Sequence, residues 1–219
     1  MQIVVNTSDG YTHLLPAFQH QWERYYGVPY LVLCENDIPS FNVPFIRVSN
    51  PRWSNRWLHF IQYNANDIFL TVNEDYWLSH PVDTEAIDRA YAFMRQNPQV
   101  DKIDLSTDRM LHKHTGYNHE YILSDPNERY LTSLQAALWR KDYMARCLTP
   151  NENPWDFETY GSLRVAGNNT ILGVRTPAMR YGQVVHARTG LYTYHLQDLD
   201  PTDVQELESK GLLPHGTSA

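Results

Sequence analysis

The most constraining feature of this sequence is the run IFLTV at residues 68–72, which is almost entirely apolar. A short apolar run of this kind is typical of a strand buried on both faces, as strands of parallel sheets are. The polar residues Asn73, Glu74 and Asp75 follow it at once. Because ligands of open α/β sheets bind at the carboxyl ends of the strands, we expect these three side chains at the edge that holds a binding site.

The chain before this run alternates between strand and helix patterns. Short β-branched or apolar runs predict strands, and apolar residues at helical spacing predict helices. In order, these are a strand at residues 2–6, a helix at 13–26, strands at 30–34 and 45–48, and a helix at 54–65. Strands that alternate with helices are the pattern of a parallel sheet with helices on its faces.

The second half of the chain gives a less regular pattern. Its expected elements, in order, are a helix from 81–83 to about 96, a strand at 102–106, an irregular excursion or flap at 109–127, a strand at 130–139, a short helix at 140–147, a helix at about 158–166 and a peripheral tail at 199–219. Together the two halves predict one α/β domain with a Rossmann-type mixed, mainly parallel sheet flanked by helices.

Charge and cysteine content argue against several function classes. The formal net charge of −7 is spread along the chain, which disfavours broad adhesion to nucleic acid or anionic membranes. Arginines make up fourteen of the eighteen basic residues, so a local basic cleft for phosphate stays open. Cys34 and Cys147 predict neither a disulfide framework nor a thiolate zinc site. No leader-like segment follows Met1 and no run of about 18 apolar residues occurs, so we expect a cytoplasmic protein without a membrane span.

The first candidate site is the acidic pair Glu74 and Asp75 after the buried strand. Mg²⁺ and Mn²⁺ prefer oxygen ligands and are commonly held in transferase sites by one or two carboxylates, with water and substrate phosphates in the remaining positions. The same pair is also typical of a solvated turn. The position therefore predicts a divalent metal site, with the solvated turn as the open alternative.

The second candidate is the segment Trp155-Asp156-Phe157-Glu158, which leads into a predicted helix. A carboxylate at a helix N-terminus is kept ionised by the helix dipole, which suits a general base, and the flanking aromatic rings offer a face on which a sugar can stack. Asp156 as N-cap with Glu158 as its capping-box partner is an equally weighted structural interpretation. If Glu158 is not the base, Asp156 is the next carboxylate to test.

Two further segments offer groups for a nucleotide. Thr7, Ser8, Asp9 and Tyr11 follow the first strand and could hold a nucleoside, although a turn of this composition is common. The segment from Arg52 to Arg56 precedes and opens the helix at 54–65 and could offer guanidinium groups to a diphosphate. Helix capping explains the same segment equally well.

Several common catalytic motifs do not occur in the sequence. It contains no HExxH, GxSxG, Walker or GxGxxG pattern, so metalloprotease, serine-hydrolase, NTPase and dinucleotide-binding interpretations lose their usual support. The pair His112 and His114 is more typical of a solvated loop than of a metal site.

Taken together, these segments resemble a family of small glycosyltransferase-like proteins of the GT-A type, often encoded in bacterial polysaccharide clusters and phage genomes. The resemblance spans roughly residues 3–190. It rests, in order, on Ser8 to Tyr11 after the first strand, WSNR at 53–56, EDYWL at 74–78 with PVD at 81–83, and SLQAALWRK at 133–141 followed by ENPWDFE at 152–158. The order and combination are more specific than any single segment.

The resemblance implies a nucleotide-sugar-binding half at about residues 1–80, an acceptor half at about 81–195 and Mn²⁺ or Mg²⁺ as cofactor. By this analogy Asp75 bridges the metal to the sugar diphosphate, Glu74 assists, and Glu158 deprotonates the acceptor hydroxyl. His186 lies where some relatives add a metal ligand. The chain departs from the usual Asp-x-Asp spelling, because Asn73 stands in the first position. The implied substrate-binding residues are Gln135, Trp139 and Trp155.

The sequence thus predicts a glycosyltransferase. The predicted donor is a nucleoside diphosphate sugar such as a UDP-sugar, and the predicted acceptor is a hydroxyl of a glycan or lipid-linked saccharide, with inversion at the anomeric carbon. Three alternatives stay open. They are transfer to a modified base of phage DNA, metal-dependent hydrolysis of phosphodiester or nucleotide-sugar bonds, and an inactive carbohydrate-binding module rich in Tyr and Trp.

Overall fold

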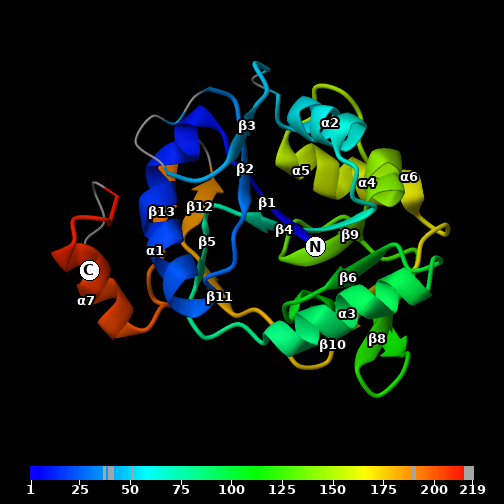
Figure 1. The fold of residues 1–219 in the computed structure, drawn as a ribbon. Coiled ribbons are helices and arrows are strands. Elements are labelled where there is room, and N and C mark those ends of the chain that lie inside the picture. Colours follow the sequence, from blue (N-terminus) through cyan, green and yellow to red (C-terminus); the bar gives the residue numbers. More distant parts are fainter. Residues whose placement is uncertain (37, 39–41, 51, 189–190, 215–219) are drawn as a thin grey trace.

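The computed structural model describes residues 1–36, 38, 42–50, 52–188 and 191–214, and only the backbone of residues 186–188 and 191–194. Within these residues, a mixed nine-stranded sheet runs through the middle of the molecule (Figure 1). The strand order is β3-β2-β1-β4-β9-β6-β10-β8-β7. The bounds are β1 (Gln2–Asn6), β2 (Leu31–Cys34), β3 (Phe45–Arg47), β4 (Ile68–Asn73), β6 (Lys102–Asp104), β7 (His114–Gly116), β8 (Tyr121–Ser124), β9 (Ala137–Arg140) and β10 (Ile171–Val174).

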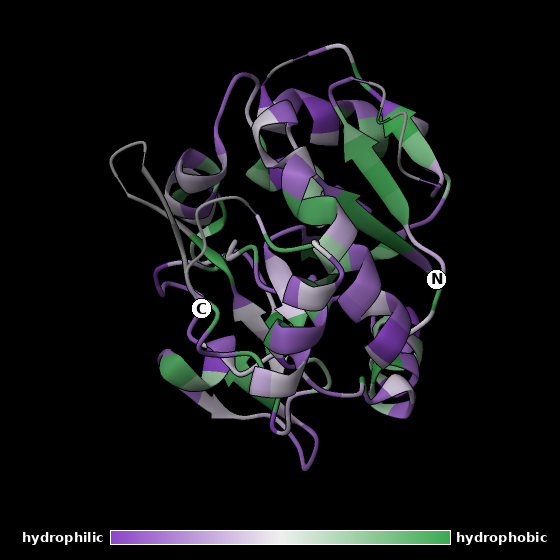
Figure 2. Ribbon diagram, turned by 90° about the vertical axis from the view of Figure 1, so that its left-hand side faces the viewer, coloured by the Kyte–Doolittle hydropathy of each residue, from purple (hydrophilic) through white to green (hydrophobic). Residues whose placement is uncertain are grey.

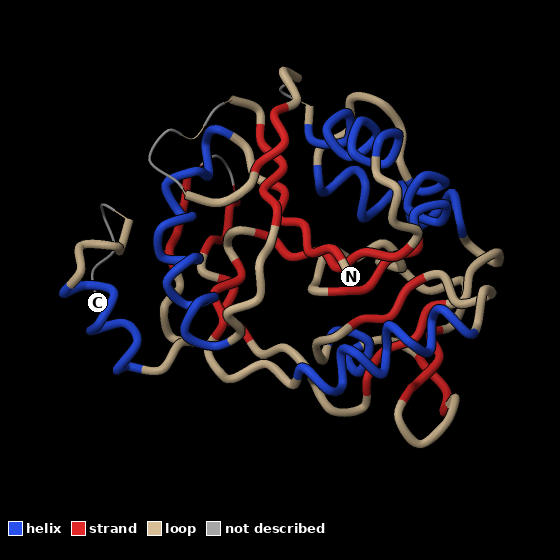
Figure 3. The backbone as a smooth tube through the Cα atoms, in the orientation of Figure 1, coloured by secondary structure: helices blue, strands red, loops and turns tan. Residues whose placement is uncertain are grey.

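Helices lie outside the strands on both sides of the sheet (Figure 3). The α-helices are α1 (Leu15–Tyr25), α2 (Trp53–Tyr63), α3 (Thr84–Gln96), α4 (Lys141–Cys147), α5 (Pro154–Asp156), α6 (Ser162–Val165) and α7 (Pro201–Ser209). Two 3₁₀ turns, η1 (Asp9–Leu14) and η2 (Asp108–Leu111), and a π-helical turn, η3 (Phe157–Gly161), complete the helical segments, and α5, η3 and α6 follow one another without a break. None of the helices in the described ranges is both long and apolar enough to cross a bilayer.

Two small sheets extend the fold beside the large one. Strand β5 (Tyr76–Leu78) pairs antiparallel with β11 (Tyr181–Gln183), and β12 (Val185–Arg188) pairs with β13 (Leu191–Tyr194). The β5–β11 pair brings residues that are more than 100 positions apart in the sequence next to the carboxyl end of β4.

The core has two layers, one on each face of the central sheet. One layer lies under α1 and α3, and the other lies under α2, α4 and the α5–α6 segment. The second layer is rich in large aromatic side chains, among them Trp57, Phe69, Trp139, Tyr143 and Phe157. Figure 2 shows the hydropathy of the elements, with largely hydrophobic central strands and helices that carry both hydrophilic and hydrophobic residues.

The predicted α/β fold with a mixed sheet is confirmed, but the parallel part is smaller than expected. Strands β1 to β4 pair in parallel, as the alternating strand and helix patterns predicted. Strand β9 then runs antiparallel to both β4 and β6, and β8 runs antiparallel to β10 and β7. The stretch 109–127, expected as an irregular excursion, contributes the edge strand β7 and its neighbour β8, which are too short to show a clear alternation.

The segment after Asp198, expected to be peripheral, contains helix α7 and packs on α1. Leu207 and Asp203 of α7 are completely buried. The Asp203 carboxylate accepts a hydrogen bond of 2.8 Å from the Tyr25 hydroxyl and lies 3.2 Å from Arg24 Nη1. The acidic composition of α7 gave no sign of this packing, because Asp203 faces inward and is paired with Tyr25 and Arg24 of α1. Residues 215–219 lie outside the described part.

Candidate functional site

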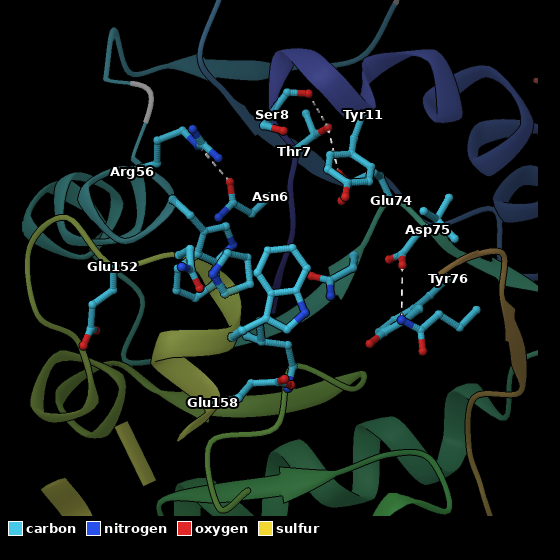
Figure 4. A pocket seen from close by; sticks show the side chains of 18 of the residues that line it. Asn6, Thr7, Ser8, Tyr11, Arg56, Glu74, Asp75, Tyr76, Glu152 and Glu158 are labelled. Atoms are coloured by element: carbon cyan, nitrogen blue, oxygen red, sulfur yellow. Dashed lines mark hydrogen bonds between the residues drawn. The ribbon is translucent and has the colours of Figure 1, made fainter. Parts of the chain in front are cut away.

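A pocket of about 410 Å³ opens at the carboxyl ends of β1 and β4 (Figure 4). Its walls come from the segments after these two strands, from the start of α2 and from the segment that leads into α5. The lining residues are Asn6, Thr7, Ser8, Tyr11, Arg52, Trp53, Arg56, Asn73, Glu74, Asp75, Tyr76, Leu134, Glu152, Asn153, Pro154, Trp155, Glu158, Gln183 and Val185. The structure therefore brings together most of the residues that the sequence singled out, from elements up to 150 positions apart.

The loop after β1 supplies one end of the pocket. Thr7, Ser8 and Tyr11 line it, as expected for a nucleoside-binding segment, whereas Asp9 is exposed and does not. Asn6 was not predicted. It is only 3% exposed, and its side-chain nitrogen Nδ2 has no hydrogen-bond acceptor among the described residues although Asn6 lines the pocket. A buried amide donor in this position can be satisfied by a polar atom of a ligand.

Arg56 lies at the bottom of the same end of the pocket. The guanidinium group is 1% exposed and donates through Nε to Asn6 Oδ1 (3.1 Å) and through Nη1 to the Asn50 carbonyl (3.3 Å). Glu35 lies 3.8 Å from it. Burial lowers the pKa of Arg56, and the nearby carboxylates oppose that effect. The side chain is thus a fixed, buried cation that lines the pocket.

In the acidic pair after β4, Glu74 is buried and Asp75 is half-buried. Burial, followed by repulsion from Asp75, raises the pKa of Glu74 to about 8, while a 3.2 Å hydrogen bond from Thr7 Oγ1 acts in the opposite direction. Burial likewise raises the pKa of Asp75 to about 7, and the Gln183 amide, 3.4 Å from Asp75 Oδ2, lowers it. The burial of Glu74 argues against the solvated turn that the sequence left open, because the side chain of such a turn is exposed to water.

The donor atoms of the acidic pair fit a divalent cation. The two adjacent carboxylates have raised pKa values although Arg56 lowers that of Glu74, so a cation bound to both would supply the further positive charge that they need. In the described part of the chain, no group of three or more His, Cys, Asp or Glu side chains is close enough to form a complete metal site. Among the described side chains, protein ligands would therefore number one or two, with water and phosphate oxygens in other positions. The backbone of His186 lies in β12, but its side chain is outside the described part.

Glu158 reaches the pocket from the opposite wall. It lies in η3, and its Oε1 accepts a 2.8 Å hydrogen bond from the backbone N–H of Leu134. Burial raises the pKa of Glu158, whereas the Leu134 N–H acts to lower it. The predicted capping box is wrong, because the helix begins earlier than expected and Asn153 caps it by accepting from the Asp156 N–H at 2.8 Å. Asp156 does not line the pocket.

The three predicted substrate-binding residues have different positions. Trp155 lines the mouth of the pocket and is 57% exposed, so its ring is accessible. Gln135 does not line the pocket; its side chain lies between the hydroxyl groups of Tyr76 and Tyr181, whose rings stack 4.6 Å apart. Trp139 is completely buried in the aromatic core layer, so the expectation that it binds substrate is wrong.

Other pocket residues were missed by sequence reasoning. Gln183 faces Asp75 because β11 pairs with β5, a pairing that the sequence pattern does not reveal. Glu152 lines the pocket and forms an ion pair with Arg164 at 2.8 Å. Arg52 and Trp53 were not missed: they belong to the segment 52–56 that the sequence offered for a diphosphate, and both line the pocket beside Arg56.

The chain is similar in structure to several solved proteins. CMP:2-keto-3-deoxy-manno-octonic acid synthetase, solved with CTP, aligns over 96% of this chain and 97% of its own length, with 16% identity and a TM-score of 0.52. TarS 1–349 from S. aureus aligns over 94% of this chain and 63% of its own, with 12% identity and a TM-score of 0.54. A cytidylyltransferase from Leptospira borgpetersenii aligns over 100% and 98%, with 10% identity and a TM-score of 0.52.

These similarities assign the fold. The chain has an α/β fold of the GT-A and nucleotidyltransferase type, with a mixed central sheet flanked by helices. It spans less than two thirds of the TarS fragment that it matches. No protein-family model matches the sequence, and no curated protein sequence matches it.

Proposed function

We propose that the protein transfers a sugar from a nucleoside diphosphate sugar, such as a UDP-sugar, to an acceptor hydroxyl. The supporting observation is that one pocket is lined by an acidic pair, Glu74 and Asp75, and by a third carboxylate, Glu158, on another wall. The charge of Glu158 is near enough to contribute to the raised pKa of Asp75. A leaving diphosphate and an attacking hydroxyl need such groups on two sides of the anomeric carbon.

In this proposal the end of the pocket near β1 holds the nucleoside. Thr7, Ser8 and Tyr11 offer hydroxyl groups, and the buried Asn6 amide offers a donor without a protein acceptor. A structure of TarS 1–349 was solved in complex with UDP, and the synthetase structure holds CTP, so a pyrimidine nucleotide suits this fold. A Mg²⁺ or Mn²⁺ ion bound by Asp75 and Glu74 would supply positive charge to the diphosphate.

The bond changes of the transfer balance without a redox partner. The acceptor O–H gives its proton to the Glu158 carboxylate while the acceptor oxygen bonds to the anomeric carbon. The bond from that carbon to the diphosphate oxygen breaks, and the diphosphate leaves with the electron pair. A single displacement of this kind inverts the anomeric centre. The Leu134 N–H, which binds Glu158 Oε1, orients the carboxylate for proton abstraction.

The exposed ring of Trp155 at the pocket mouth supports a saccharide acceptor. An indole face packs well against the apolar face of a sugar, and this ring both lines the pocket and reaches solvent. The net charge of −7 disfavours DNA as acceptor, because binding to a phosphate backbone depends on clustered positive charge.

Nucleotidyl transfer is a second candidate function. Two solved proteins named as a CMP-sugar-acid synthetase and a cytidylyltransferase match nearly the full length of both chains, whereas the match to TarS is partial. In that reaction an oxygen of a sugar acid would attack the α-phosphate of a nucleoside triphosphate, and pyrophosphate would leave. Arg52 and Arg56, which line the pocket, offer cationic groups for the longer phosphate chain.

One experiment separates these functions. The protein is incubated with UDP-sugars or with CTP and sugar acids, each with and without Mn²⁺, and the products are identified by mass spectrometry. Sugar transfer to an added saccharide with release of UDP supports the proposal. Release of pyrophosphate supports nucleotidyl transfer, and free sugar without a transferred product supports a hydrolase. The absence of any nucleotide-dependent rise in melting temperature would contradict all three and favour a carbohydrate-binding module.

A further inference from the structure

Four charged side chains form a buried cluster next to the pocket. Lys102 and Asp104 lie on β6, and Asp108 and Arg109 lie on η2. The side chains of Lys102, Asp104 and Arg109 are 0% exposed. Lys102 Nζ lies 2.7 Å from Asp104 Oδ1, Arg109 Nε lies 3.1 Å from Asp104 Oδ2, and Arg109 also pairs with Asp108. The cluster thus contains two cations and two anions.

The cluster lies in the aromatic core layer rather than at the surface. Lys102 Nζ is 4.6 Å from the centre of the Trp139 ring. Removing charged groups from water is expensive, and a buried ion pair often stabilises a protein no more than well-packed apolar side chains would. A contribution to stability is therefore a weak explanation for two cations in this layer. The groups to which the two cations donate hydrogen bonds point to another role.

Both cations hold the backbone of one loop. Arg109 Nη2 donates to the carbonyl of Tyr130 at 3.0 Å, and Lys102 Nζ donates to the carbonyl of Ser133 at 2.7 Å. Tyr130 has a φ of 57°, a left-handed conformation that non-glycine residues rarely adopt and that persists only where neighbouring contacts enforce it. The cluster therefore fixes the loop at residues 130–134 at two points.

The same loop holds Glu158. The Leu134 N–H donates to Glu158 Oε1 at 2.8 Å. The Thr132 hydroxyl contacts the carbonyls of Phe157 and Glu158 at 2.9 and 3.1 Å. Both the side chain and the backbone of Glu158 are thus anchored to a loop that the buried cations anchor in turn.

We propose that Lys102 and Arg109 are positioning residues for Glu158, which they orient through the loop at residues 130–134. The inference rests on the proposed function only for the role of Glu158 as base. Neither cation lines the pocket, so neither is expected to touch substrate. Their role is to keep the Leu134 N–H, and with it the Glu158 carboxylate, in one place during proton abstraction.

The charges around Glu158 support this proposal. Burial raises its pKa, the Leu134 N–H lowers it, Lys102 and Arg109 lower it, and Asp108 raises it. Across the pocket, Asp75 and Glu158 also repel each other. Loss of the correct loop position removes the hydrogen bond from Leu134, so it should move the pKa of Glu158 further upward.

Gly173 on β10 offers a way to disturb the cluster without changing its charge. A Cβ atom at this position would lie 2.5 Å from Cβ and 2.8 Å from Cγ of Arg109, so Gly173→Ala must displace the Arg109 side chain. Arg109→Lys is a second variant. Lysine keeps a cation, but its single amino group cannot reproduce the separate contacts of Arg109 Nε with Asp104 and of Arg109 Nη2 with the Tyr130 carbonyl.

The test compares these two variants with Arg140→Lys. Arg140 is a matched control, because it also donates to main-chain carbonyls, those of Met94 and Val100, but away from Glu158. The Glu158 pKa is measured by NMR titration of protein labelled with ¹³C at glutamate carboxyls, with the signal assigned by its loss in Glu158→Gln. Turnover, donor KM and melting temperature are measured alongside.

We expect Arg109→Lys and Gly173→Ala to raise the Glu158 pKa and to lower kcat at least about tenfold at unchanged donor KM, since small displacements of a catalytic group are costly. Arg140→Lys should change only the melting temperature. An unchanged Glu158 pKa in both cluster variants overturns the proposal, whatever their stability. The titration needs no substrate, so it is independent of the proposed function, which fails separately if Glu158→Gln keeps normal turnover.

Discussion

The two walls of the pocket hold their carboxylates in different ways. The strand-end wall, formed by Thr7, Glu74 and Asp75, contains an acidic pair whose burial raises the two pKa values to about 8 and about 7. The helix wall, formed by Trp155 and Glu158, contains one carboxylate that is tied to a backbone N–H and backed by buried cations. At the strand-end wall Arg56 lowers the pKa of Glu74, one of two carboxylates, whereas at the helix wall Lys102 and Arg109 both act on a single carboxylate.

This difference indicates what each wall needs in order to work. A bound cation stabilises the ionised form of carboxylates whose pKa values are raised. We therefore infer that the strand-end wall needs a cation to be complete. A carboxylate fixed by protein donors needs no such partner, so the helix wall is preorganised. The comparison assigns donor binding to the strand-end wall and proton transfer to the helix wall, and the following variants test that assignment.

The largest expected effect is that of Glu158→Gln. Glutamine keeps the shape and the hydrogen bond from Leu134 but loses basicity, so turnover should fall by about 10²–10⁴-fold while donor affinity stays near wild type. Steady-state kinetics and calorimetry with UDP measure the two quantities. The control is Asp156→Asn, which removes a carboxylate two positions away that does not line the pocket. If the turnover of Glu158→Gln were within a few-fold of wild type, Glu158 would not be the base.

The same residue sets an expected pH dependence. A base must be deprotonated to act, and burial raises the pKa of Glu158 above the ordinary carboxyl value. Activity should therefore be low at acidic pH and should rise through a limb that lies above the ordinary glutamate pKa of about 4.3. The pH profile of kcat/KM measures this limb. A limb at or below the ordinary value would contradict the assignment.

The second effect concerns Asp75→Asn. If the strand-end wall is completed by a cation, this change should weaken Mn²⁺-dependent binding of UDP by at least about tenfold, or 1.4 kcal/mol. Calorimetry with and without Mn²⁺ gives the comparison. Asp67→Asn is the control, because Asp67 lies before the other end of β4 and its side chain is 83% exposed. Undiminished metal-dependent affinity in Asp75→Asn would show that Asp75 does not hold the metal.

The strand-end wall was more predictable from the sequence than the helix wall. The apolar run at 68–72 predicted a buried strand, and a polar group after such a strand emerges at the ligand-binding edge whatever the rest of the chain does. Local pattern therefore placed Glu74 and Asp75 in the pocket. The same reasoning placed Thr7 and Ser8 after β1, because β1 and β4 are parallel neighbours.

The helix wall depends on contacts that no local pattern encodes. Glu158 was found from its aromatic neighbours and from the family resemblance, but its anchor is the backbone N–H of Leu134, which carries no side-chain signal. Trp139 was misassigned because an aromatic residue beside a candidate motif gives the same pattern in a core as in a binding site. Trp139 lies on β9, which pairs antiparallel with β4 and β6. These pairings join residues far apart in the sequence and determine on which face of the sheet the Trp139 side chain lies.

A smaller effect is expected at the mouth of the pocket. Trp155→Ala should raise the KM for a saccharide acceptor about fivefold, which corresponds to about 1 kcal/mol for a stacked aromatic ring, without changing donor affinity. Tyr160→Ala is a matched control, since Tyr160 is 53% exposed on the same helical segment but does not line the pocket. Equal effects of the two variants would show that the helix wall does not bind the acceptor through Trp155.

The smallest effect is expected for Gln183→Leu, which probes how much the protein itself does for the strand-end wall. The Gln183 amide lies 3.4 Å from Asp75 Oδ2, at the long limit of a hydrogen bond, whereas the Glu158 anchor on the helix wall measures 2.8 Å. A contact this long contributes about 0.5 kcal/mol, so Mn²⁺-dependent UDP affinity should fall only about twofold. Calorimetry with wild type, Gln183→Leu and Asp75→Asn in one buffer measures the three affinities for UDP.

If Gln183→Leu weakened binding as much as Asp75→Asn does, the amide would be orienting the carboxylate as firmly as Leu134 orients Glu158. The strand-end wall would then be preorganised by the protein too, and the contrast between a ligand-completed wall and a prebuilt one would fail.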